Sequence, residues 1–243
     1  MAGQTNAKLA VLVDADNAQA SLSKELFAEM SRYGTATIKR AYGDWTTTNL
    51  TRWKEVLHPL AIQPIQQFNN TKGKNSTDSA LIIDAMDILH AQSVDGFCIV
   101  SSDSDFTRLA TRIRESGRVV YGFGRRDTPV AFQAACDKFI YTEILQSETS
   151  QPQPAEKAVE AFAFPALQPM VEAAIEATAR DDGWASMSAV GAQMNRTTPS
   201  FDARNYGFKK LTELMRKQAY VELKEQAVMD GSGHPQVRLK IRG

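Results

Sequence analysis

The sequence has few of the residues that build a covalent or soft-metal framework. It contains only two cysteines and three histidines among 243 residues. Cys98 lies in an apolar run and Cys136 lies among alanines, so neither a disulfide framework nor a paired-cysteine metal site is expected. His58, His90 and His234 are far apart and lack the spacing of zinc ligands. These absences exclude a disulfide-stapled secreted module and favour a reducing, cytoplasmic location.

The sequence also lacks an excess of charge of one sign and a long hydrophobic run. Lys plus Arg equals Asp plus Glu at 28 each, so the overall charge indicates neither nucleic acid nor a membrane surface as a partner. The first apolar run, residues 9–13, is too short for a signal-peptide core or a membrane span, and we expect no targeting signal. With 43% hydrophobic residues, the chain can form one large or two modest globular domains.

Strand and helix patterns alternate over the first 145 residues. Short apolar runs typical of strands occur at residues 9–13, 35–42, 62–68, 96–100, 118–123 and 139–141. Helical spacing separates most of them, as in residues 18–33, where Leu22, Leu26 and Met30 share one face. Strands that alternate with crossover helices predict an α/β, Rossmann-like domain with a central, mostly parallel sheet.

A second, smaller domain follows a polar segment. Residues 146–157 are rich in Gln, Ser, Thr, Pro and Glu, which is typical of a linker. Helical patterns then occur at 170–180, 187–195 and 207–218, and alternating patterns at 220–223 and 237–241 predict a hairpin. Three helices and a hairpin indicate a winged helix, an α+β domain. We therefore expect domains at 1–145 and 165–243, joined by a linker at 146–164.

Acidic residues follow the ends of predicted strands. Asp14 and Asp16 come after the first strand, Asp103 and Asp105 after the strand 96–100, and Asp78 begins a helix. In a doubly wound sheet these strand ends adjoin at the point where the strand order reverses. Crowded carboxylates repel one another, and a hard divalent cation with oxygen ligands resolves this. We expect Mg²⁺ or Mn²⁺, which can activate water for in-line displacement at phosphorus.

Asp78, Asp103 and Asp105 also have a purely structural interpretation as helix caps. Ser102 with Asp105 three residues later fits a capping box, and Asp78 fits a helix N-cap. Ser102 and Ser104 could instead satisfy the first amides of the following helix. In that arrangement Asp103 is a direct metal ligand, and Asp105 is a direct or water-mediated one. Farther along the helix that Asp78 begins, predicted over residues 78–91, Asp84 and Asp87 fall off the apolar stripe and are interpreted as surface acids that pair with Gln92 or solvent.

Three motifs resemble a known family. Val-Asp-Ala-Asp-Asn at 13–17, Asn-Ser-Thr-Asp-Ser-Ala-Leu at 75–81 and Val-Ser-Ser-Asp-Ser-Asp-Phe at 100–106 resemble the NYN domain, a PIN-like nuclease family, over residues 8–145. The resemblance implies a metal-dependent ribonuclease. It implies four catalytic and metal-binding acids, namely Asp14, Asp78, Asp103 and Asp105. Asn17 matches the polar residue beside the first acid, and Ser101 and Ser102 are expected to support the site. Asp16 has a weaker claim and is expected to face the adjoining helix.

The C-terminal part resembles a second family. Tyr-Gly-Phe-Lys-Lys-Leu-Thr-Glu-Leu at 206–214, with Phe201 and Asp202 ahead of it, is similar to the LOTUS or OST-type helix-turn-helix domain over about residues 165–243. The resemblance implies a winged helix that binds RNA or docks a protein partner. Lys209 and Lys210 lie on a basic helix edge, which is either a solvated face or a phosphate contact.

Basic and aromatic residues near the predicted crevice suggest how RNA would be held. We hypothesise that Lys72, Lys74, Arg125 and Arg126 contact flanking phosphates and that Trp45 stacks on a base. Each of the five could equally be an ordinary surface residue. The expected function is hydrolysis of phosphodiester bonds, most naturally in single-stranded RNA, by a metal-dependent endoribonuclease.

Other functions remain open from the sequence. A NYN fold could bind RNA or a partner without cutting, because fold does not determine function. Asp14 and Asp16 also begin the haloacid-dehalogenase phosphatase pattern, but Ala18 stands where that pattern needs Thr or Val, and Asp78 would be unexplained. A calcium loop starting at Asp103 fails because apolar and basic residues occupy ligand positions. A single Gly-x-Gly at 122–124 gives weak support for a dinucleotide site.

Overall fold

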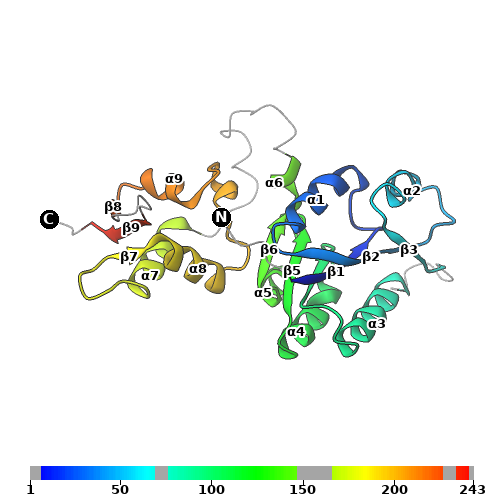
Figure 1. The fold of residues 1–243 in the computed structure, drawn as a ribbon. Coiled ribbons are helices and arrows are strands. Elements are labelled where there is room, and N and C mark those ends of the chain that lie inside the picture. Colours follow the sequence, from blue (N-terminus) through cyan, green and yellow to red (C-terminus); the bar gives the residue numbers. More distant parts are fainter. Residues whose placement is uncertain (1–6, 69–75, 147–165, 227–233, 241–243) are drawn as a thin grey trace. The chain divides into compact units, whose positions relative to one another are not determined.

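The computed structural model describes residues 7–68, 76–146, 166–226 and 234–240 (Figure 1). The chain divides into two compact units, residues 1–151 and 152–243. The predicted linker, apart from residue 146, lies outside the described residues, as do Lys72 and Lys74. The domain limits at 145 and 165 therefore stay predictions. In the described part of the chain, no helix has both the length and the apolar character needed to cross a membrane.

Unit 1 is built on a parallel sheet. Its described strands are β1 (Lys8–Asp14), β2 (Thr35–Gly43), β3 (Gln63–Gln66), β4 (Gly96–Val100), β5 (Val119–Gly124) and β6 (Lys138–Tyr141). They form a sheet in the order β3-β2-β1-β4-β5-β6, and every pair is parallel. The order reverses between β1 and β4, so the predicted switch point and the predicted Rossmann-like α/β fold are confirmed.

Helices cover both faces of this sheet. They are α1 (Ser23–Met30), α2 (Thr51–Leu57), α3 (Ser76–His90), α4 (Thr107–Glu115), α5 (Val130–Ala135) and α6 (Thr142–Gln146). In Figure 1, α1, α2 and α6 lie on one side of the sheet and α3, α4 and α5 on the other. The five residues 9–13 of β1 are almost fully buried, which explains why the central strand reads as a continuous apolar run.

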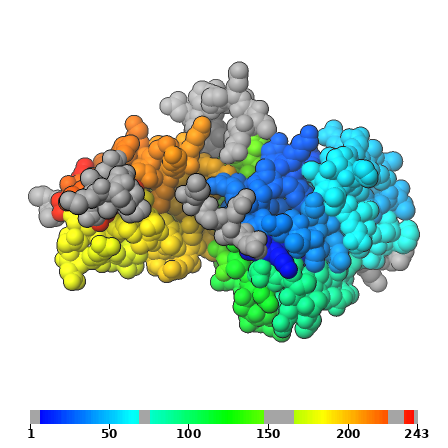
Figure 2. Space-filling model, viewed as in Figure 1, coloured from blue at the N-terminus to red at the C-terminus, as the bar shows by residue number. Residues whose placement is uncertain are grey.

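The strand β3 lies at the sheet edge. It pairs only with β2 in the described sheet order, and Figure 2 shows α2 and β3, in cyan, gathered at one end of unit 1. Pro64 has no N–H to donate, and an edge strand is where proline is tolerated. The edge position of β3 therefore fits the presence of Pro64 in that strand.

The helix α3 is attached to the sheet by a polar clamp that the sequence did not predict. Asp84 accepts hydrogen bonds from the Arg40 guanidinium and the Tyr42 hydroxyl, both on β2. Burial, followed by the neighbouring Asp84 carboxylate, raises the pKa of Tyr42 above its ordinary value. The interpretation of Asp84 as a surface acid is wrong. Its side chain lies off the apolar stripe of α3, but it contacts β2 there rather than solvent. Asp87 is exposed, as predicted.

Unit 2 is a small α+β domain. Its described elements are α7 (Leu167–Glu176), β7 (Ala185–Ser186), α8 (Met187–Thr197), α9 (Leu211–Arg216), β8 (Val221–Gln226) and β9 (His234–Leu239). The strands pair antiparallel in the order β7-β9-β8. Val171, Val190, Met194, Met215 and Val237 are buried together in its core. Helices packed on a small hairpin sheet match the predicted winged helix.

The predicted third helix of unit 2 is shorter than expected. A helix over 207–218 was predicted, whereas a 3₁₀ turn occupies Ala203–Tyr206 and α9 starts only at Leu211. Gly207 has a φ of 83°, in the left-handed region that glycine adopts without strain. Lys210 is extended. The helical spacing of apolar residues therefore begins before the helix itself does.

Candidate metal centre

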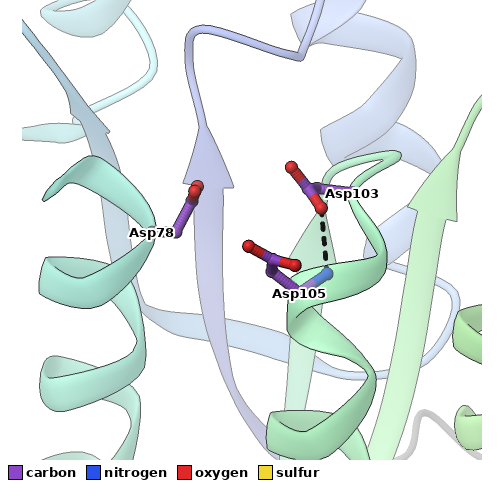
Figure 3. A group of neighbouring side chains, drawn as sticks. All are labelled: Asp78, Asp103 and Asp105. Carbon is purple, nitrogen blue, oxygen red and sulfur yellow. Dashed lines mark hydrogen bonds between the residues drawn. The ribbon is translucent and has the colours of Figure 1, made fainter. Parts of the chain in front are cut away.

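Three carboxylates converge beside the carboxyl ends of β1 and β4. Asp78, Asp103 and Asp105 each offer an oxygen atom, and these three atoms lie within 4.8 Å of one another. Asp78 projects from the first turn of α3, while Asp103 and Asp105 lie on the connection from β4 to α4 (Figure 3). We call these three residues the acid triad. Because α3 begins at Ser76, Asp78 lies inside the helix, and its interpretation as an N-cap is wrong.

The connection after β4, residues 101–106, is called the acid loop. The Ser101 N–H donates to the Phe123 carbonyl oxygen at 3.0 Å and so extends the pairing of β4 with β5. The chain then forms a 3₁₀ turn, Ser104–Phe106, whose N-cap is Asp103. Asp103 Oδ1 accepts the Asp105 N–H at 2.9 Å. Asp103 is thus the cap in place of the predicted Ser102, and the capping bond uses only one of its two oxygens.

Asp14, the last residue of β1, is almost fully buried. Its Oδ2 accepts from Asn17 Nδ2 and from Ser101 Oγ, both at 2.8 Å. Ser101 Oγ in turn accepts the Asp103 N–H at 3.1 Å. Burial raises the pKa of Asp14, although its hydrogen bonds with Asn17 and Ser101 oppose the shift. Ser101 therefore ties Asp14 to the acid loop, and Asn17 holds the same carboxylate from the connection after β1.

The electrostatics of the triad favour a cation. The pKa of Asp78 is raised to about 6, first by burial and then by the negative charges of Asp14, Asp103, Asp105 and Asp16. The donor set consists entirely of carboxylate oxygens, which Mg²⁺ and Mn²⁺ prefer over softer ligands. A divalent cation would relieve the repulsion that raises this pKa. The residues present therefore fit the predicted metal.

Asp16 lies outside the triad. Its Oδ2 accepts from Thr77 Oγ1 of α3 at 3.3 Å. The pKa of Asp16 is raised by burial and by the charge of Asp44. Asp16 thus contacts α3, the helix that carries Asp78.

The two arginines predicted to hold phosphates have local partners. Arg125 Nε donates to Asp127 Oδ1 at 3.0 Å. The Arg126 N–H donates to Glu143 Oε1 at 3.0 Å, and its Nε atom is buried. Ser102 Oγ accepts the Arg125 N–H at 2.9 Å. Ser102 therefore supports the acid loop from the side of β5.

The other residues predicted to contact RNA lie in varied settings. Trp45 is half-buried, and its indole N–H donates to the Ile65 carbonyl oxygen at 3.0 Å. This bond fixes the ring beside β3. Lys209 and Lys210 are exposed just ahead of α9.

Comparison with solved structures gives low overall similarity. A protein of unknown function from Vibrio parahaemolyticus is 20% identical, with 57% of this chain and 94% of that chain covered and a TM-score of 0.47. An uncharacterized protein from Nitrosomonas europaea is 37% identical, with 39% and 90% covered and a TM-score of 0.30. A protein from Chromobacterium violaceum is 39% identical, with 33% and 86% covered and a TM-score of 0.29. At these TM-scores the likenesses add nothing to the assignment of function.

Family models give a clear assignment. No curated protein matches the chain. A model of the NYN domain matches residues 8–146, and a model of the OST-HTH/LOTUS domain matches residues 163–231. The NYN match covers more than half of the chain, and the acids of its motifs meet at the switch point of the sheet. The chain therefore belongs to the NYN family, within the PIN-like nuclease superfamily, and carries a LOTUS domain after its NYN domain.

Proposed function

We propose that this protein is an Mg²⁺- or Mn²⁺-dependent endoribonuclease that hydrolyses phosphodiester bonds in single-stranded RNA. The observation that carries the proposal is the convergence of Asp78, Asp103 and Asp105 beside the ends of β1 and β4. The crevice outside the carboxyl ends of strands is where open α/β sheets bind ligands. A bound divalent cation would supply charge stabilisation for phosphoryl oxygens and lower the pKa of attacking water.

The acids of the centre would have different roles in the reaction. Asp78, Asp103 and Asp105 would hold the cation through carboxylate oxygens. Asp14 adds negative charge to the same centre, as its effect on the pKa of Asp78 indicates. It also holds Ser101, and through it the Asp103 N–H. We include Asp14 among the catalytic acids on this basis.

The test is cleavage of single-stranded RNA, structured RNA and DNA with Mg²⁺, with Mn²⁺ and with EDTA. Wild type is compared with Asp103→Asn and Asp105→Asn, and Asp87→Asn is the matched control because Asp87 is exposed on α3. We expect cutting of single-stranded RNA that EDTA abolishes and that both site variants lose by about 100-fold or more. Equal residual cutting by all four proteins would indicate a contaminating nuclease and refute the proposal.

RNA binding without cleavage is the competing function. One observation favours it: the Asp14 carboxylate is occupied by Asn17 and Ser101. In that case RNA would be retained by wild type and never cut. A phosphatase of the haloacid-dehalogenase type fits poorly, because Asp14 would be its nucleophile and is about 1% exposed.

The LOTUS domain would act as a binding module for RNA or for a protein partner. Lys209 and Lys210 are exposed and could contact phosphates. Replacing both with Ala should weaken RNA retention and reduce its salt dependence, and an unchanged salt dependence would favour a protein partner. A cytoplasmic location is part of the proposal, and the two cysteines are free and buried.

A further inference from the structure

The connection that follows β5, residues 124–128, lies directly against the acid loop. A Cβ added at Gly124 would come within 2.6 Å of the Ser101 carbonyl oxygen and within 2.7 Å of Thr128 Oγ1. Both distances are far below van der Waals contact, so glycine allows this close approach. The next residue, Arg125, donates its N–H to Ser102 Oγ at 2.9 Å. The end of β5 and the acid loop are therefore in contact through both backbone and side-chain atoms.

A series of buried and partly buried hydrogen bonds fixes this connection. Thr128 Oγ1 donates to the Arg125 carbonyl oxygen at 2.6 Å. Gln133 Nε2, on α5, donates to the Thr128 carbonyl oxygen at 2.7 Å. The Tyr141 hydroxyl, on β6, donates to Gln133 Oε1 at 2.8 Å. Thr128, Gln133 and Tyr141 are all buried. Buried polar groups are costly to leave unpaired, so this series resists displacement.

Packing adds a second connection between α5 and the acid loop. Phe132 precedes Gln133 and is fully buried. Its ring centre lies 6.4 Å from that of Phe106 in the acid loop and 5.8 Å from that of Phe139 on β6. The position of α5 relative to the acid loop is therefore set by an aromatic contact as well as by the hydrogen bonds.

We propose that Gln133 is a positioning residue for Asp103, acting through Thr128, Arg125 and Ser102. The inference rests on the proposed metal-dependent cleavage. Gln133 does not touch the acid triad, and an aliphatic side chain at its buried position would avoid the cost of desolvating an amide. Its amide instead holds the Thr128 carbonyl, and the Arg125 N–H carries that constraint to Ser102, the residue before Asp103.

The test compares Mn²⁺ affinity by calorimetry with steady-state cleavage of single-stranded RNA in the full chain. We expect Gln133→Leu to weaken Mn²⁺ binding by about 10-fold, the scale of outer-shell substitutions at metal sites. We expect kcat to fall with the KM for RNA unchanged. Ile62→Val, a mild truncation of a buried residue beside β3, is the stability control and should leave Mn²⁺ affinity unchanged.

A double-mutant cycle separates positioning from general destabilisation. Ser102→Ala should weaken Mn²⁺ binding by itself, and the double variant Ser102→Ala with Gln133→Leu should bind no worse than the weaker single variant. The inference would be overturned if the losses of Mn²⁺ affinity in the two single variants multiplied in the double variant. It would also be overturned if Gln133→Leu bound Mn²⁺ as tightly as wild type. Either result would leave the nuclease proposal intact. A wild-type protein that neither binds Mn²⁺ nor cuts RNA would overturn both.

Discussion

The acid loop and the first turn of α3 bring carboxylates to the same point by different means. Asp103 and Asp105 lie in a loop whose backbone is held by short-range bonds to Ser101 and by the Asp103 cap itself. Asp78 lies on a helix that is fastened to β2 further along, at Asp84. We call the acid loop, residues 101–106, and the helix α3 the two walls of the centre. The comparison shows that the acid-loop wall is positioned by bonds close to its carboxylates, whereas the helix wall is positioned by a contact farther along α3.

The largest loss of RNA cleavage is expected when a proposed metal ligand is removed from either wall. Asp78→Asn and Asp105→Asn should each lower RNA cleavage by about 100-fold or more, because each removes charge that the transition state needs. Single-turnover cleavage at saturating enzyme measures the loss. If either wall can be neutralised with full activity retained, the two walls do not form one centre.

A smaller effect is expected inside the acid-loop wall. Ser101→Ala removes a donor from the buried Asp14 carboxylate and the acceptor for the Asp103 N–H. The free energy of unfolding should fall by about 1–3 kcal/mol, the cost of an unsatisfied buried polar group. Urea denaturation checks this. Ser104→Ala, at an exposed position of the same loop, should change stability by less than about 0.5 kcal/mol. A similar decrease in the free energy of unfolding in both variants would show that the bonds of Ser101 do not stabilise the acid loop.

The helix wall should respond more weakly. Asp84→Ala leaves Arg40 and Tyr42 without their shared acceptor. The ion pair is partly exposed, so the free energy of unfolding should fall by only about 1 kcal/mol. Because the rest of α3 still packs on the sheet, Mn²⁺ affinity should fall less than in Ser101→Ala. A greater loss of affinity in Asp84→Ala would reverse the comparison between the walls.

The smallest effect is a pH dependence carried by Asp78. Its pKa in the folded protein, about 6, lies above the ordinary value of 3.8. Protonation therefore favours the folded state, and this stabilisation is complete below the ordinary value and lost as pH rises through about 6. In EDTA, the Tm of Asp78→Asn minus the Tm of wild type should increase as the pH rises from about 4 to about 7, because only wild type loses this stabilisation. A constant difference across this range would show that Asp78 is not crowded by the other acids.

The acid positions were predictable because parallel strands end at one edge of a sheet. The runs at 9–13 and 96–100 indicated β1 and β4, and their pairing at the switch point followed from the alternation of strands and helices. That rule needs only the order of elements, so it placed Asp103 and Asp105 beside the end of β1 without knowledge of any side-chain geometry.

Details that depend on one residue of register were not predictable. Whether Ser102 or Asp103 caps the 3₁₀ turn depends on where the chain leaves the extended conformation, and both residue types are good caps. The partners of Asp84 come from a strand far away in the sequence. Helical periodicity shows that a polar side chain lies off the apolar stripe but not what it meets there. Gly207 did carry a usable signal, since glycine often ends a helical segment.

The central claim is that Asp78 and the acid loop share one metal ion, and calorimetric titration with Mn²⁺ tests it most directly. The proteins compared are wild type, Asp78→Asn, Asp103→Asn and the exposed control Asp87→Asn. We expect wild type and Asp87→Asn to bind alike, and each triad variant to bind at least about 10-fold more weakly. Equal affinity in all four proteins, or loss in only one triad variant, would contradict a shared site.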